Sequence, residues 1–153
     1  MKNILIISSS PRKKGNSQIL CEQFKKGAEA KGHQVKIVRI MEQNIGFCRA
    51  CDGCMRNGGT CVLKDDMAEI LKMFQKADVL VLATPVYFYG ISGQMKTFID
   101  RTYPIWQHLG KKEVAVYLVA NDNAIPFYEK LGMRKAEDVM EYNHIEWTPF
   151  TVK

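Results

Sequence analysis

The sequence predicts an α/β fold in which helices cover both faces of a parallel sheet. Short apolar segments rich in β-branched residues alternate with stretches of helical periodicity, which is the pattern of consecutive βαβ units. The most apolar segment, DVLVLATPVY over 78–87, is typical of a strand buried in such a sheet. No internal repeat or linker-like composition divides the 153 residues, so we expect one domain over 1–153.

The first half of the chain supplies two strands and two helices. KNILIIS (2–8) is a buried strand, and a helix over 16–31 ends at Gly32. HQVKIVRI (33–40) alternates as a second strand. After an irregular segment over 44–64, Asp65 or Asp66 caps a helix that extends to about Lys76.

The second half continues the alternation. After the strand over 78–87, the loop FYGISGQ leads into a helix over 93–107, and EVAVYLVA (113–120) is a fourth strand. A helix over about 123–131 and a strand over about 138–143 follow. Together with strand 113–120 they form a further βαβ unit.

Composition excludes several classes of function. No apolar run is long enough to span a bilayer, and the apolar stretch near the start, Ile4 to Ile7, is too short for a secretory signal. The net charge is +6, but the basic residues are scattered apart from those at 12–14, so we expect no nucleic-acid partner. We expect a cytoplasmic protein without a membrane partner.

The first motif is SSSPRKKGNS (8–17), which lies between the first strand and the first helix. Ligands of open α/β sheets bind at the carboxyl ends of the strands. A Ser- and Gly-rich loop that opens a helix offers N–H groups and hydroxyls to a phosphate, and Arg12 adds charge. The motif is neither GxGxxG nor the P-loop pattern. A polar turn with a helix cap is the alternative.

The second motif is TPVYFYGISGQMKTFIDR (84–101), which follows the strand over 78–87. Three aromatic residues, Tyr87, Phe88 and Tyr89, stand in a strand-end loop, where their rings can stack on a flat cofactor. Gly90 and Gly93 would let the backbone approach that cofactor closely. A dimer interface or simple loop packing is the alternative.

The third motif is a cluster of four of the five cysteines, Cys48, Cys51, Cys54 and Cys61. Such clustering in a reducing compartment indicates metal or redox chemistry more than a disulfide framework. Four thiolates within 14 residues can converge on one metal centre, and zinc is a candidate. Loop packing without metal is the alternative. Cys21 lies on a helical pattern and is expected to be a buried apolar residue.

These three motifs, in this order, closely resemble the flavodoxin-like NAD(P)H-dependent FMN reductase family, including its iron–sulfur flavoprotein branch, over residues 1–110. The resemblance implies a five-stranded parallel sheet of order 2-1-3-4-5. It also implies an oxidoreductase that binds FMN, takes electrons from NAD(P)H and passes them to an acceptor that the sequence does not identify. The cofactor supplies the chemistry, so no dedicated catalytic side chain is expected.

The resemblance assigns the site residues by position. It implies that the FMN phosphate contacts Ser8, Ser10, Arg12, Asn16 and Ser17. The isoalloxazine ring would be lined by Pro85, Val86, Tyr87, Phe88 and Tyr89. A 4Fe–4S cluster would be bound by Cys48, Cys51, Cys54 and Cys61.

The last 40 residues carry a different resemblance. The pattern NDNAIPFYEKLG (121–132) is similar to the closing segment of the GNAT acetyltransferase superfamily, in which the residue at the position of Tyr128 often protonates the departing thiolate. The Gly-rich turn that binds coenzyme A in that superfamily is missing before this segment, so acetyl transfer is disfavoured. We place the junction between the two parts near 111–116.

Such a segment can complete the sheet, but the standard final helix of the flavodoxin-like fold would be missing. Part of the sheet would then be uncovered unless the tail or another subunit packs on it, and uncovered apolar surface promotes association. We therefore expect a homo-oligomer. The alternative to an active reductase is a fusion product that keeps the fold but has impaired turnover, because the loop after strand 113–120 departs from the family pattern.

Overall fold

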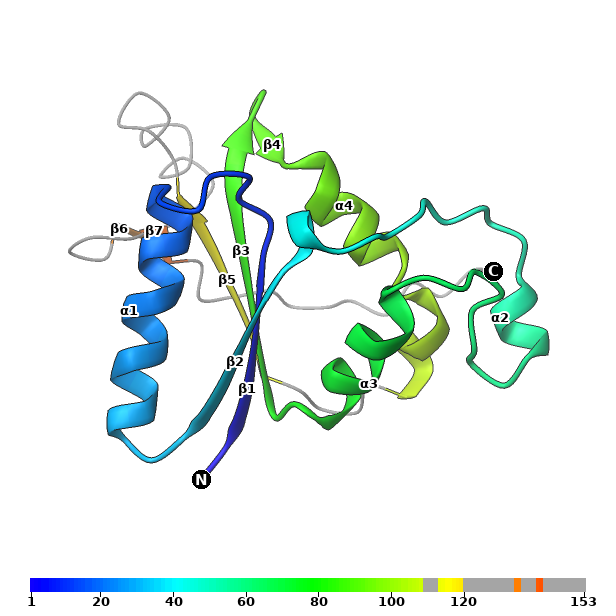
Figure 1. The fold of residues 1–153 in the computed structure, drawn as a ribbon, viewed down its shortest axis with the longest axis horizontal. Coiled ribbons are helices and arrows are strands. Elements are labelled where there is room, and N and C mark those ends of the chain that lie inside the picture. The colour runs from blue at the N-terminus through cyan, green and yellow to red at the C-terminus, as the bar shows by residue number, and fades with distance from the viewer. Residues whose placement is uncertain (109–112, 120–133, 136–139, 142–153) are drawn as a thin grey trace.

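The computed structural model describes residues 1–108, 113–119, 134–135 and 140–141. Its centre is a twisted sheet with helix α1 (Asn16–Ala30) on one face and helices α3 (Met67–Lys76) and α4 (Gly93–Asp100) on the other (Figure 1). Strand β1 (Asn3–Ser8) contributes to both faces, because alternate side chains of a strand point in opposite directions. Ile4 and Ile6 pack with Cys21 of α1, whereas Leu5 and Ile7 belong to the core beneath α3 and α4.

Four strands of the sheet are parallel. They are β2 (Gln34–Arg39), β1, β3 (Val79–Tyr87) and β5 (Glu113–Val119), in that spatial order. This order agrees with the first four positions of the predicted sheet. The α/β class and the alternation of strands and helices are thereby confirmed.

The prediction of five parallel strands is wrong. Within the segment expected as a parallel strand over 138–143, the described residues form the two-residue strand β7 (Met140–Glu141), which pairs antiparallel with β5. The two-residue strand β6 (Arg134–Lys135) pairs antiparallel with β7. The antiparallel pairing of β6 with β7 agrees with the short distance between them in the sequence, because antiparallel neighbours can be joined by a tight loop, whereas parallel ones need a full crossover. The expected helix over 123–131, the GNAT-like pattern over 121–132 and the tail from 142 lie outside the described residues.

The predicted helix over 93–107 is two elements instead of one. Helix α4 ends at Asp100, and a 3₁₀ helix, η2, covers Tyr103–His108. Pro104 explains the break, because a proline ring in a continuous helix would clash with the carbonyl four residues earlier, here that of Asp100. The irregular segment before α3 contains two further short helices, the 3₁₀ helix η1 (Ile40–Glu42) and the four-residue α2 (Gly53–Arg56).

A buried ion pair fastens the end of α4 to the start of α3. Arg101 is 2% exposed, and its Nη1 and Nη2 donate to the two carboxylate oxygens of Asp65 over 2.6 and 2.9 Å. Asp65 also accepts from the backbone N–H groups of Gly46 and Met67, the latter being the first residue of α3. The N-cap position itself is Asp66, the other residue that the sequence offered, and its side chain makes no capping bond. Burial would raise the pKa of Asp65, but the hydrogen bonds from Arg101 and from these N–H groups together hold that pKa below its ordinary value.

Asp65→Asn is expected to lower the free energy of unfolding by about 3–5 kcal/mol, because it leaves the buried guanidinium without its counter-charge. The matched control is Asp100→Asn, which breaks the exposed pair between Lys96 and Asp100 and should cost about 1 kcal/mol or less. Urea unfolding at neutral pH measures both. An equal loss of unfolding free energy in the two variants would show that the buried pair stabilises the fold no more than the exposed pair does.

The stabilisation that the Arg101–Asp65 pair contributes depends on pH. Because the folded-state pKa of Asp65 lies below its ordinary value of 3.8, its stabilisation is complete above that value. It is lost as the pH falls through the folded-state pKa. The difference in unfolding free energy between the natural protein and Asp65→Asn should therefore become smaller only as the pH falls below the ordinary pKa of Asp65.

Candidate functional site

The candidate site lies where strands β1 and β3 end. The two strands are parallel neighbours with Ser8 opposite Ala83, so the loops that follow them emerge at the same edge of the sheet (Figure 1). One is the serine-rich loop of residues 8–17, which leads into α1. The other is the aromatic hairpin of residues 86–91, in which β3 turns back through the short strand β4 (Gly90–Ile91).

The serine-rich loop leaves the N-terminus of α1 available to an anion. Gly15 occupies the N-cap position and brings no side-chain oxygen to the first N–H groups, and the first turn contains no acidic residue. A Cβ on Gly15 would stand 3.1 Å from the Cβ of Arg12 and 3.2 Å from Ser10 Oγ, so glycine permits this tight turn. The turn is closed by the N–H of Gly15, which donates to the carbonyl of Arg12 over 3.2 Å.

The structure gathers four of the five predicted phosphate residues around this turn. Arg12 and Asn16 are exposed, and Ser10 and Ser17 are buried beside the helix start. Ser8 differs, because its hydroxyl is fully buried and donates to Oε1 of Gln18 over 3.0 Å.

Cys21 lies beneath the serine-rich loop, one turn along α1 from Gln18. It is 3% exposed, and burial raises the pKa of its thiol to about 11, although a hydrogen bond with Ser8 acts in the opposite direction. A thiol with this pKa is protonated at neutral pH and is therefore a poor nucleophile. The structure thus agrees with the expectation that Cys21 is a core residue.

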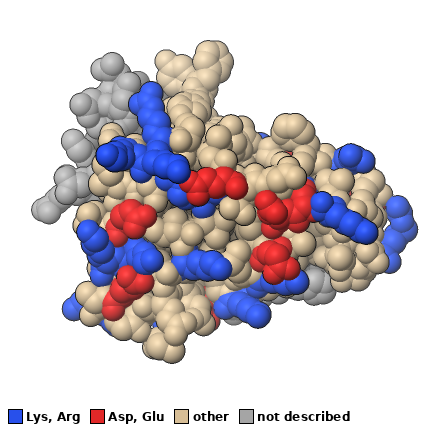
Figure 2. Space-filling view, in the orientation of Figure 1, with Lys and Arg blue, Asp and Glu red and all other residues tan. Residues whose placement is uncertain are grey.

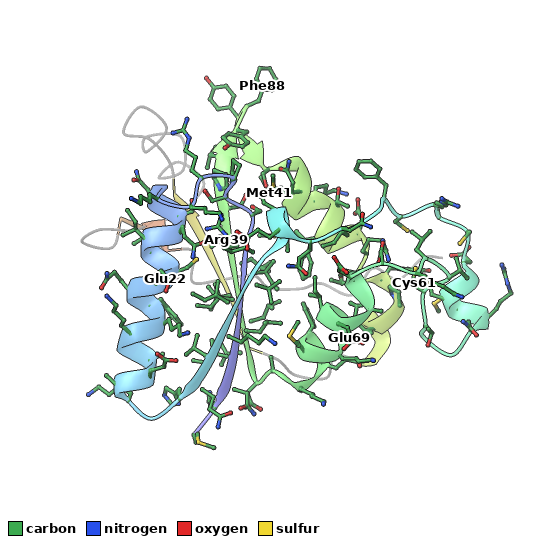
Figure 3. The ribbon with its side chains drawn as sticks, viewed as in Figure 1. Glu22, Arg39, Met41, Cys61, Glu69 and Phe88 are labelled. Atoms are coloured by element: carbon green, nitrogen blue, oxygen red, sulfur yellow. The ribbon has the colours of Figure 1, made fainter. Side chains whose placement is uncertain are left out.

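The aromatic hairpin projects from the molecule, as the labelled Phe88 shows (Figure 3). Of the predicted ring-lining residues, Pro85 and Val86 are half-buried, whereas Tyr87, Phe88 and Tyr89 are exposed. Val86 pairs with Ile91 and Tyr87 with Gly90, so the turn itself consists of Phe88 and Tyr89.

The turn is strained. Phe88 and Tyr89 have φ angles of 48° and 61°, and two-residue hairpin turns with both φ angles positive normally contain Asn and Gly. Bulky side chains in this region of φ/ψ space are rare and cost roughly 1 kcal/mol or more each. Both rings at this strained turn are exposed, and Phe88 is 99% exposed.

Three further residues join the two loops, and the sequence analysis missed them. They are Ser9, Thr84 and Ser92, each 0% exposed. Ser92 is the N-cap of α4 and its hydroxyl accepts from the N–H of Met95 over 3.3 Å. The same hydroxyl donates to Ser9 Oγ over 2.8 Å. The position of Ser92 just before the helical pattern was a signal for the N-cap of α4. Its hydrogen bond to Ser9 has no signature in the sequence.

The four clustered cysteines lie in a second region, on the long connection between β2 and α3 (Figure 3). All four line one pocket, together with Arg101. Cys48 and Cys51 are exposed, Cys61 is half-buried and Cys54 is buried. Across the described ranges, however, no three side chains of the Cys, His, Asp or Glu type stand close enough to hold a metal ion. The thiols therefore share a pocket without forming a closed ligand set.

Two features shape this cysteine pocket. Ala50 and Asp52 have positive φ angles of 49° and 51°, so the backbone between Cys48 and Cys54 is tightly folded. Gly53 permits a close approach between the two halves of the pocket, because a Cβ there would stand 2.6 Å from Cγ1 of Val62.

Arg101 places a buried positive charge against the pocket. The hydrogen bond with Asp65 raises the pKa of Arg101 most, burial opposes it, and the neighbouring Cys61 raises it further. Within the described part of the chain its Nε has no hydrogen-bond partner. Asp65 balances the charge of Arg101, and the spare Nε–H group offers one hydrogen-bond donor to a ligand in the pocket.

The surface agrees with the scattered charge of the sequence. On the face in Figure 2, basic and acidic side chains interleave over α1, β2 and the cysteine-containing connection. None of the described helices is both long and apolar enough to cross a bilayer.

Comparison with known proteins places the chain among flavin reductases. The family described as NADPH-dependent FMN reductase matches residues 2–124. An iron–sulfur flavoprotein of Archaeoglobus fulgidus is 40% identical over 98 residues, which is 64% of this chain and 44% of that protein. One from Methanocaldococcus jannaschii is 33% identical over 102 residues, 67% of this chain and 52% of that protein. The chain thus spans about half the length of these curated relatives.

Solved structures support the fold. An NAD(P)H:quinone oxidoreductase from Methanothermobacter marburgensis superposes with a TM-score of 0.65 at 16% identity, covering 86% of this chain and 71% of that one. An azoreductase from Bacillus anthracis gives 0.63 at 16% identity, covering 86% and 80%. At these identities the likeness establishes the flavodoxin-like fold and nothing finer.

The strained turn yields a prediction that needs no cofactor. Phe88→Asn combined with Tyr89→Gly should raise the free energy of unfolding by roughly 1–2 kcal/mol, because Asn and Gly adopt the positive φ angles with less strain. Urea unfolding of the flavin-free protein measures the change. Phe47→Asn, at an aromatic residue that is 78% exposed and lies outside the turn, should give no such gain. A double variant that is less stable than the natural protein would contradict the strain argument.

Proposed function

The chain belongs to the NADPH-dependent FMN reductase family, and from this premise we propose that it is a flavoprotein that binds FMN at the carboxyl edge of its sheet. Electrons pass from NAD(P)H through the flavin to a small-molecule or protein acceptor. One observation carries the proposal. The parallel pairing of β1 with β3 brings an anion-binding helix start and an aromatic hairpin to the same edge.

The serine-rich loop would hold the FMN phosphate. The free N–H groups at the start of α1 point their partial positive charge at the ligand, and Arg12 adds a full charge. Ser10, Asn16 and Ser17 lie around the same turn and offer further donors. Ser8 supports the loop from below through its bond to Gln18, so its hydroxyl is occupied before any ligand arrives.

The aromatic hairpin would hold the isoalloxazine ring. Pro85 and Val86 provide a half-buried apolar floor, and the three aromatic side chains after them are exposed and able to stack. Bound FMN supplies the hydride and electron chemistry. The residues of this chain bind the flavin, orient it and exclude water from one side of it, and the proposal assigns none of them a proton.

The test is a fluorescence titration of FMN into flavin-free protein. We expect saturable binding of one FMN, and a loss of roughly tenfold or more in affinity for the variant Phe88→Asn/Tyr89→Gly, because stacking on the hairpin is removed. Phe47→Asn is the control and should bind as the natural protein does. NADPH oxidation measured on the same samples separates a competent reductase from a fusion product that binds FMN without turnover. Absence of FMN binding by the natural protein would overturn the proposal.

We also propose that the cysteine pocket holds a 4Fe–4S cluster through Cys48, Cys51, Cys54 and Cys61. Four thiols on one pocket and a spare N–H donor of Arg101 beside them suit a thiolate-bound centre. Zinc bound by the same four thiolates is the alternative for this pocket.

Anaerobic reconstitution with ferrous iron and sulfide tests the cluster. We expect about four iron and four sulfide per chain, and loss of both in Cys54→Ala. The matched control is Cys21→Ala, which removes a thiol outside the pocket and should retain the cluster. Equal iron content in the two variants would exclude the assignment, and selective retention of zinc would favour the zinc site.

We also propose that the chain forms a homo-oligomer. The aromatic hairpin, with Phe88 at 99% exposure, is apolar surface that a second copy of the chain could cover.

A further inference from the structure

Three buried hydroxyls connect the serine-rich loop to the aromatic hairpin, and we call them the hydroxyl bridge. They belong to Ser9, Thr84 and Ser92, and all three residues are 0% exposed. Ser9 follows strand β1, Thr84 lies near the end of β3, and Ser92 follows β4 at the start of α4. The bridge therefore joins residues that are up to 83 positions apart in the chain.

Ser92 is bonded to both of the other residues of the bridge. The hydroxyl of Ser92 donates to Ser9 Oγ over 2.8 Å, and that of Ser9 lies 3.4 Å from the carbonyl oxygen of Ala83. The backbone N–H of Ser92 donates to Thr84 Oγ1 over 3.0 Å, and the hydroxyl of Thr84 donates to the carbonyl of Pro85 over 3.0 Å. Each hydroxyl proton thus has an acceptor inside the protein, as buried polar groups require.

The bridge lies directly behind the candidate FMN site. Ser9 lies between Ser8 and Ser10 in the serine-rich loop, and Pro85 is the first residue of the proposed floor under the ring. The bond between Ser92 and Ser9 therefore joins the serine-rich loop to the start of α4, at the base of the hairpin. The N–H and the hydroxyl of Ser9 also bond the carbonyl of Ala83, but that residue lies in β3 before the hairpin begins.

We infer that Ser92 is a positioning residue for FMN, which acts by joining the phosphate and ring halves of the site into one preorganised unit. This inference rests on the proposed FMN site. A ligand that touches two loops pays less to bind when the loops already stand at the right separation. In the proposed site FMN would contact both loops, whereas riboflavin, which lacks the phosphate, would contact only the hairpin.

The alternative role of Ser92 is purely structural. Its hydroxyl caps α4 by accepting from Met95, and loss of an N-cap lowers stability by itself. Ser9→Ala separates the two roles, because it removes the partner of Ser92 in the bridge and leaves the cap intact. Thr97→Ala is the control for α4, because it removes a hydroxyl that only bonds the carbonyl of Gly93 within the helix.

The experiment measures dissociation constants for FMN and for riboflavin with the natural protein and with Ser92→Ala, Ser9→Ala, the double variant and Thr97→Ala. We expect Ser92→Ala and Ser9→Ala each to weaken FMN by roughly fivefold to tenfold, in keeping with the loss of one buried hydrogen bond. Riboflavin should weaken by less than twofold, so the preference for FMN over riboflavin falls. The double variant should show no further fall, because both single changes break the same bond. Thr97→Ala should keep the natural preference.

Two results would overturn the inference. One is an unchanged preference for FMN in both single variants, with only the unfolding midpoint of Ser92→Ala lowered, because a cap alone would then account for Ser92. The other is an equal loss for FMN and riboflavin, which would place the effect within the hairpin. Absence of FMN binding by the natural protein would instead overturn the proposed function and the inference with it.

Discussion

The parallel pairing of β1 with β3 is the constraint on which the rest of the structure depends. Register places Ser8 opposite Ala83, so two loops separated by some 70 residues of chain start side by side. The apolar residues of β1 make this pairing obligatory, because they fill the cores on both faces of the sheet at once. A one-residue slip would exchange the two faces. The position of the site is therefore fixed by burial of residues that never touch a ligand.

Among the described residues, the strained backbone positions lie in the two candidate sites. The non-glycine residues with positive φ angles in the described ranges are Ala50, Asp52, Phe88 and Tyr89, two in the cysteine connection and two at the tip of the hairpin. Strain of this kind persists only where the surrounding structure enforces it. Here the β3–β4 ladder enforces it at the hairpin, and the close approach at Gly53 enforces it at the cysteines.

The sequence predicted those parts of the fold that are set by local pattern. Strands β1, β2, β3 and β5 and helices α1 and α3 follow from periodicity and from stop signals such as Gly32. The end of α4 also has a signal in the sequence, because Pro104 disfavours one continuous helix from Asp100 through residue 104, although the helical periodicity over 93–107 predicts one. The Ser92–Ser9 and Arg101–Asp65 bonds could not be predicted from the sequence, because they join residues 83 and 36 positions apart without any shared local pattern.

Helix α4 relates the two candidate sites to each other. It begins at the hydroxyl bridge, where Ser92 bonds Ser9, and it is followed at once by Arg101, which bonds Asp65 and lines the cysteine pocket. Both ends are held by buried hydrogen bonds, and eight helical residues span roughly 12 Å. A helix anchored in this way cannot shift at one end without breaking buried polar contacts at the other. A flavin at the hairpin and a cluster at the cysteines would consequently be kept at a set separation by the fold itself, independently of the residues that bind either one.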